Sequence, residues 1–219
     1  RLLIDNGADV NAVDGIGDTP LHDAVKAEVA ELLIGEGADV NAFNEVRETP
    51  LHRAKNAKVA RVFIANGADV NGVYGERVSP IYSAVLYSRA DVIEVLIEEG
   101  ADVNERVKQG WTLLHAAAVA KGPKVIQVLC NNGLDVNERD HYGATPLHVA
   151  ALNDHFRGAE KLLELGADID VRLDDGVVSY QKSILGGQES HIRDVSGKTP
   201  LELARSKKMR ALLKKAESS

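Results

Sequence analysis

One short phrase recurs six times at nearly constant spacing, and this restricts the fold more than any other feature of the chain. Its fullest copy is the run 143–151, Gly-Ala-Thr-Pro-Leu-His-Val-Ala-Ala. Its central Thr-Pro-Leu-His, with variations, begins at Thr19, Thr49, Ser79, Thr112, Thr145 and Thr199. A second phrase, Gly-x-Asp-Val-Asn or a close variant, begins at glycines 7, 37, 67, 100, 133 and 166. Self-similarity at such a period predicts an array of stacked units.

Each unit has the signals of two helices followed by a turn. Thr145 can cap a helix through its hydroxyl, and Pro146 at the first helical position sacrifices no hydrogen bond. The apolar positions that follow Leu147 at helical spacing predict a buried stripe. A second helix is expected at 159–165, and Gly166 can adopt the left-handed conformation that ends helices. A single unit cannot bury its apolar face alone, so neighbouring units must stack.

The motif positions are evenly spaced from Thr19 to Ser79 and again, at a slightly longer interval, from Ser79 to Thr145. The interval from Thr145 to Thr199 equals one repeat of the longer kind plus an insert of 21 residues near the C-terminus. With its Thr-Pro-Leu-His-x-Ala motif and a period of about 33 residues, the chain resembles an ankyrin-repeat protein over nearly its whole length.

The resemblance implies an all-α solenoid of helix-turn-helix units with hairpin-like turns. It also implies that the motif histidines are structural. A partner protein would bind through the hairpin tips and the exposed side of the first helices, a concave face.

We expect one ankyrin-repeat domain over residues 1–219. Its predicted parts are a partial N-terminal repeat (1–18), five repeats (19–48, 49–78, 79–111, 112–144 and 145–172), an insert (173–193) and a C-terminal capping repeat (194–219).

Three parts of the array depart from the regular pattern. The units that begin at Thr19 and Thr49 lack three residues between their helices, which predicts clipped loops and shortened first helices. The unit at Ser79 has Tyr82 in place of the motif histidine, which should alter the local hydrogen bonds. The insert has turn signals at both ends around a β-branched and aromatic run, and we expect an extended finger or a short helix there.

Composition limits the classes of partner. A formal net charge of −7 argues against general nucleic-acid binding, which needs a basic face. No apolar run approaches the length of a membrane span. The single cysteine, Cys130, cannot form an internal disulfide and favours a reducing compartment. We therefore expect a monomeric, cytoplasmic protein.

No catalytic or metal site is expected, and no cofactor. Histidines 22, 52, 115 and 148 occur once per unit, which predicts a row, whereas a metal ion needs three or four converging ligands. His141, His155 and His191 are scattered. The basic run 205–215 is interpreted as a solvated helix face at the C-terminal cap.

The remaining candidates are surface residues at the turns and the nearby helix ends, where aromatic side chains gather although they form only 4% of the chain. The predicted partner-binding residues are Phe43, Glu45, Tyr74, Glu76, Tyr87, Lys108, Trp111, His141, Tyr142 and Tyr180. Aromatic anchors often dominate interfaces. The alternative is that Trp111 and Tyr142 pack flat against neighbouring tips and only stabilise the stack.

Two other functions are left open. The chain begins at Arg1, within what should be a second helix, so we expect a piece of a longer protein. It could then be the targeting module of an enzyme or of a bacterial effector that acts in a host cytoplasm. Alternatively, the asparagines at 11, 41, 71, 104 and 137 resemble the sites that an asparaginyl hydroxylase modifies on ankyrin repeats.

Overall fold

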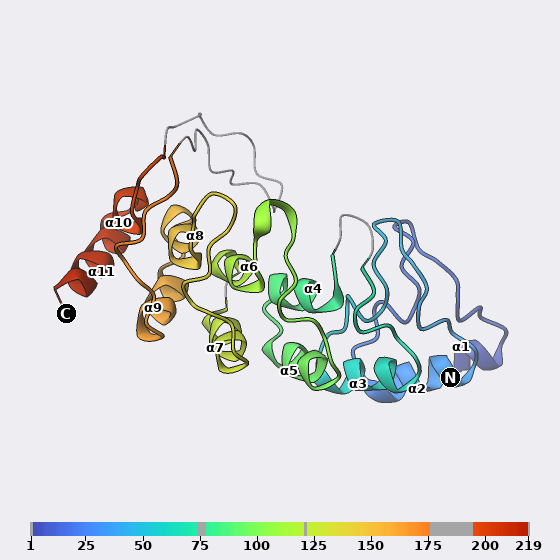
Figure 1. The fold of residues 1–219 in the computed structure, drawn as a ribbon. Helices are drawn as coiled ribbons and strands as arrows, with labels where there is room; N and C mark the ends of the chain where they lie inside the picture. Colours follow the sequence, from blue (N-terminus) through green and yellow to red (C-terminus); the bar gives the residue numbers. More distant parts are fainter. Residues whose placement is uncertain (1, 74–77, 121, 176–194, 219) are drawn as a thin grey trace. The chain divides into compact units, whose positions relative to one another are not determined.

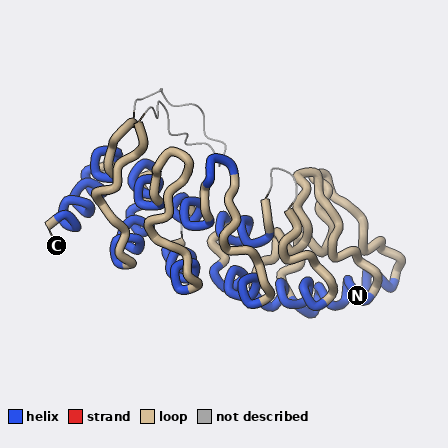
Figure 2. The backbone as a smooth tube through the Cα atoms, in the orientation of Figure 1, coloured by secondary structure: helices blue, strands red, loops and turns tan. Residues whose placement is uncertain are grey.

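The computed structural model describes residues 2–73, 78–120, 122–175 and 195–218, which belong to two compact units, 1–103 and 104–219. We call these the N-terminal and the C-terminal unit. The described residues form helices and loops but no strand (Figures 1 and 2), which confirms the all-α prediction.

The N-terminal unit is built on a row of second helices. Its helices are α1 (Leu2–Asp5), α2 (Ala27–Gly35), α3 (Ala57–Ala65), α4 (Pro80–Leu86) and α5 (Ala90–Glu98). Helix α3 packs between α2 and α5, and α4 packs on α5. Each of α2, α3 and α5 is followed by a glycine with positive φ, the left-handed conformation that ends a helix. Long loops on one side of the row form the hairpin tips (Figure 2).

The two clipped repeats have lost most of their first helix. Where α4 has seven helical residues, the repeats that begin at Thr19 and Thr49 have only a turn, at 20–23 and 50–53. A single turn is held by His22 N–H, which donates to the carbonyl of Thr19 at 2.9 Å. Three residues are nearly one helical turn, so their deletion removes the second turn of a two-turn helix. The predicted shortening is confirmed.

The C-terminal unit contains two rows of helices. After the 3-10 turn η1 (Lys108–Gly110) come α6 (Leu113–Val119), α7 (Pro123–Asn131), α8 (Pro146–Leu152), α9 (Phe156–Glu164), α10 (Pro200–Leu203) and α11 (Lys207–Glu217). The first helices α6, α8 and α10 pack in one row, and the second helices α7, α9 and α11 pack in the other. The threonines at the helix starts act as expected, and the side chains of Thr112 and Thr145 cap α6 and α8.

Small residues let the first helices approach each other. Ala116, Ala117, Ala150 and Ala151 are buried on α6 and α8, between large aliphatic side chains such as the fully buried Leu147. Aromatic residues are rare in this core because helices at short separation leave little room for rings.

The described residues that flank positions 176–194 lie together. The backbone N–H of Leu173 donates to the carbonyl of Lys198 at 3.1 Å, and Gly197 N–H donates back to Leu173 at 3.2 Å. Leu173 and Val195 are buried in one cluster with Ala144, and Tyr142 packs against it. Most of the predicted insert (173–193), with its expected finger or short helix, lies outside the described residues, which resume at 195.

Candidate functional site

The motif histidines bond within their own motif and to the segment that leads into the next motif. Thr19 N–H donates to Nδ1 of His22 at 3.0 Å, so this nitrogen is an acceptor and Nε2 carries the proton. Nε2 then lies 3.1 Å from the carbonyl oxygen of Glu48, the residue directly before the next motif at Thr49. The same pattern joins His148 to the carbonyl of Lys198 at 3.2 Å. These residues hold neighbouring repeats together.

Burial keeps the imidazoles of His52, His115 and His148 neutral. It lowers the pKa of His52 and of His115, and it lowers the pKa of His148 to about 4, because a charged ring would lose its hydration. The backbone carbonyl that each Nε2 meets acts in the opposite direction but is the weaker influence. Across the chain segments that the structure describes, no three histidine, cysteine or acidic side chains gather closely enough to hold a metal ion.

Asparagines form a second set of bonds between repeats, at the base of the tips. The side-chain amide of Asn11 donates to the carbonyl of Gly37 at 3.0 Å and accepts from Asp39 N–H at 2.9 Å. The side-chain amides of Asn41, Asn71 and Asn137 make the equivalent pairs of bonds. Both polar atoms of these amides are therefore engaged in bonds between repeats.

The hairpin tips of the N-terminal unit carry exposed apolar side chains at matching positions. Val13, Phe43 and Val73 hold the same place on three successive tips and are 64%, 42% and 49% exposed. Ile16 and Val46 form a second matching pair, 52% and 67% exposed. Water contact is unfavourable for apolar surface, and such side chains gathered in one area mark interaction surfaces.

Polar bonds fix the first two of these tips against each other. The side-chain amide of Asn44 donates to Oδ1 of Asp18 at 2.7 Å, and Glu45 N–H donates to the carbonyl of Ile16 at 3.1 Å. Gly17 has a positive φ, and a Cβ there would come within 2.8 Å of the Glu45 nitrogen, so only glycine fits this contact. The tips therefore present their apolar side chains on an ordered backbone.

The comparisons with known proteins agree with this geometry. The family described as "Ankyrin repeats (3 copies)" matches three overlapping stretches, residues 1–74, 27–107 and 81–172. The chain belongs to the ankyrin-repeat family. The ankyrin-repeat domain of human ASB11 is 25% identical, with a TM-score of 0.70 over 97% of this chain and 89% of that one. The ankyrin-repeat domain of Bcl-3, described as a unique member of the IkappaB protein family, is 23% identical. It has a TM-score of 0.65 over the same shares of the two chains.

No curated protein sequence matches the chain. None of the helices described has the length and the apolar character that a membrane span needs.

Three predicted contact residues of this ankyrin array lie on the surface of the N-terminal unit. Phe43 and Glu45 are exposed on one tip, and the guanidinium of Arg47 lies 5.3 Å from the Phe43 ring centre. Tyr87, at the end of α4, is 50% exposed and is covered on one face by Arg89, 4.5 Å from the ring centre. Tyr74, Glu76 and Tyr180 lie outside the described residues, and so does the side chain of Lys108.

In the C-terminal unit, Trp111 is not a surface residue. It is 4% exposed, and its ring lies 6.0 Å from that of His115 in a stacked arrangement. The tight turn η1 directs the chain back toward α6, which places the indole inside the repeat. The prediction of Trp111 as a partner-binding residue is therefore wrong, because a buried ring has almost no surface for a partner. His141 is exposed at its tip, and Tyr142 is half-buried.

Sequence reasoning missed Val13, Ile16 and Val73 because it searched the tips for aromatic and charged anchors. The signal was nevertheless present in the repeat spacing. Val13 and Val73 stand one repeat before and one repeat after Phe43, and Ile16 stands one repeat before Val46. Comparing tips position by position would have identified them.

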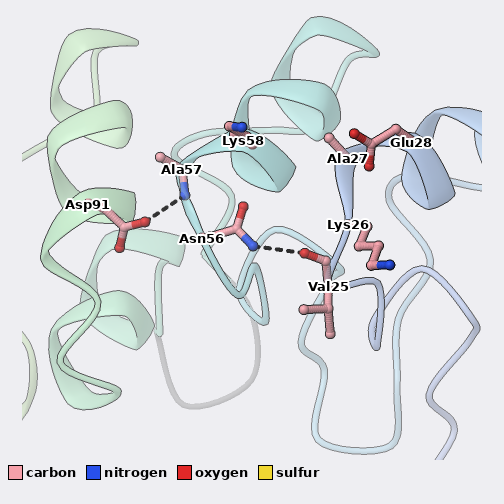
Figure 3. A pocket seen from close by; sticks show the side chains of 8 residues that line it. All are labelled: Val25, Lys26, Ala27, Glu28, Asn56, Ala57, Lys58 and Asp91. Carbon is pink, nitrogen blue, oxygen red and sulfur yellow. Dashed lines mark hydrogen bonds between the residues drawn. The ribbon is translucent and has the colours of Figure 1, made fainter.

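A groove of about 890 Å³ lies at the start of the second helices α2, α3 and α5 (Figure 3). Its lining residues are Val25, Lys26, Ala27, Glu28, Asn56, Ala57, Lys58 and Asp91. Asn56 crosses it by donating to the carbonyl of Val25 at 2.8 Å. The groove opens where the clipped repeats lack their helix-to-helix loops, and the sequence analysis did not anticipate it.

Proposed function

We propose that this ankyrin array is a protein-interaction scaffold, without catalysis in residues 1–219. A partner protein binds through the hairpin tips and the exposed side of the first helices. Ankyrin-repeat domains are generally protein–protein interaction modules. The observation that supports the tips in this chain is the set of apolar side chains repeated on three successive tips.

The physical argument is that these tips lose little freedom on binding. The bonds between Asn44 and Asp18 and between Glu45 and Ile16 already order the backbone. An ordered surface avoids much of the entropy cost of association, so burial of Phe43 and its neighbours contributes more fully to affinity. Exposed apolar anchors surrounded by polar groups are also typical of interface centres.

The proposed contact surface keeps Phe43, Glu45, Tyr87, His141 and Tyr142, adds the aliphatic tip residues, and omits the buried Trp111. The remaining predicted residues, Tyr74, Glu76, Lys108 and Tyr180, stay candidates. We further propose that the array acts as a monomer in the cytoplasm. A targeting module of a larger enzyme or effector would bind its partner through the same surface. It would differ only in bringing that partner to the rest of the larger protein.

The test is a capture experiment with a tip variant. Phe43→Ser combined with Val46→Ser should weaken binding of the captured partner at least about tenfold, since interface anchors commonly contribute about 2 kcal/mol or more. Binding is measured by titration after the partner is identified by capture from the source cell and mass spectrometry. The matched control is Glu31→Ser with Glu94→Ser, two exposed changes on second helices, which should keep full affinity. Equal affinity of both double variants, each with a native circular dichroism spectrum, would refute the tip surface.

A further inference from the structure

The exposed apolar side chains on the hairpin tips form two rows that follow the period of the array. The first row is Val13, Phe43 and Val73, and the second is Ile16 and Val46. The interfaces beneath these rows are built alike. The side-chain amide of Asn11 donates to the carbonyl of Gly37 at 3.0 Å. One repeat later, Asn41 donates to the carbonyl of Gly67, also at 3.0 Å. Equivalent tip residues are therefore separated by the same step at both interfaces.

The length of this step selects the secondary structure of an occupant. Helices that pack side by side, as α2 and α3 do, are about 10 Å apart, and their tips share that spacing. In an α-helix, every seventh residue returns to nearly the same face after about 10.5 Å. Residues on one face of a β-strand recur after about 6.6 or 13 Å, and neither distance matches. A helix along the first row can therefore place one side chain on each successive tip.

The hairpins that carry these rows are negatively charged. Residues 1–103 contain nine Lys or Arg against eighteen Asp or Glu, a net charge of −9, whereas the whole chain has −7. On the hairpins, Asp18 and Glu48 pair with Arg53. The other described hairpin carboxylates are exposed, and they are Asp9, Asp14, Asp39, Glu45 and Asp69. Among the described residues 8–18, 38–48 and 68–73, Arg47 is the one cation, and it lies against Phe43. Such a surface favours a cationic partner.

We propose that the occupant of the tips is a basic amphipathic helix of the partner protein. Its apolar side chains recur every seven residues, one on each tip of the first row, and an intermediate set covers Ile16 and Val46. Lysine or arginine side chains on both flanks of this face meet the exposed carboxylates. The inference rests on the tip surface proposed above and adds the chemistry of its occupant. A nucleic acid or an anionic membrane is disfavoured, because the net charge of this unit repels both.

Peptide titration of the whole chain, residues 1–219, followed by nuclear magnetic resonance, tests the helix. The probe is an acetylated and amidated peptide of three copies of Leu-Ala-Ala-Leu-Lys-Ala-Lys. One control has the same residues with the leucines distributed around the helix, and the other has glutamate in place of lysine. The probe should shift the backbone amide signals of Val13, Phe43 and Val73 together, and neither control should do so. Equal binding of the probe and the redistributed peptide would overturn the proposal, and so would no binding of the probe.

Variants of the chain test the two parts of the proposed contact. Val13→Ser with Val73→Ser should weaken binding of the probe about tenfold, because two apolar contacts are lost. Val25→Ser with Val29→Ser removes two valines that are 61% and 43% exposed away from the tips, and it should leave the affinity unchanged. Unchanged affinity of the Val13 and Val73 variant would show that the probe does not follow the row.

The charges are tested with Asp14→Asn and Glu45→Gln together, which should weaken binding of the probe about threefold. The matched control is Glu31→Gln with Glu94→Gln, an equal change of charge on second helices, which physiological salt should largely screen. Equal losses in the two double variants would mean that only the total charge attracts the peptide, and the proposed flanking contacts would be wrong.

Failure of the helix and failure of the tip surface give different results. If Phe43→Ser with Val46→Ser weakened binding of the captured partner but the probe did not bind, the tip surface would stand and the helical occupant would be wrong. If that variant kept the full affinity for the captured partner, the tip surface itself would be wrong, and the inference would fall with it.

Discussion

Replacement of Phe63 by alanine is expected to lower the free energy of unfolding by about 3–5 kcal/mol. Phe63 is fully buried on α3, the helix that packs between α2 and α5. Removing the ring loses its transfer energy and leaves a cavity in the middle of the helix row. Because each repeat is stabilised mainly by its neighbours, a loss at this position weakens both of its interfaces.

Urea unfolding followed by circular dichroism measures this effect. The matched control is Phe43→Ala, which removes the same ring from an exposed tip and should cost less than about 1 kcal/mol. A Phe63→Ala midpoint indistinguishable from that of Phe43→Ala would contradict the assigned core of the N-terminal unit.

Acid should destabilise the chain through its buried histidines, and His148 is the one with which we test this. Its pKa falls from 6.5 to about 4 on folding because the ring is buried. A group whose pKa is lower in the folded state contributes its full stability above the unfolded pKa. That contribution is lost as the pH falls from about 6.5 to about 4. The loss for His148 amounts to roughly 3 kcal/mol when both states are protonated.

The measurement is the free energy of unfolding at pH 7, 5.5 and 4 for the natural chain and for His148→Gln. The glutamine variant keeps a polar side chain but does not titrate, so its stability should fall less between pH 7 and pH 4, by roughly 3 kcal/mol. Carboxylates contribute equally to both proteins and cancel in the comparison. Parallel pH dependences would show that His148 is not buried in its neutral form.

Much of the fold was predictable because the same helix-start and helix-end signals recur in successive repeats. Helix capping explains the Thr-Pro starts and the glycine ends. Helical pitch explains why a three-residue deletion shortens the first helix. The roles of the motif histidines also followed, but from the family resemblance. Only the structure shows the proton on Nε2, because that depends on the backbone N–H that meets Nδ1.

The candidate surfaces were harder to predict because they depend on which residues of successive repeats meet. Trp111 looked like an exposed anchor because it lies beside a tip, and only the course of the backbone through η1 places it inside. The groove at the start of α2, α3 and α5 is lined by residues of three successive repeats. Which of them meet depends on the stacking register in three dimensions, which the sequence alone does not give.

The hydrogen bonds that join Leu173 to Gly197 and Lys198 also determine how freely this protein can be modified in evolution or in the laboratory. These bonds hold residue 173 beside residues 197 and 198. The entropy of closing a loop rises only slowly with its length, by about 0.6 kcal/mol for each doubling. A much longer segment, or an entire folded domain whose termini lie close together, could therefore be grafted between these residues without unstacking the repeats on either side.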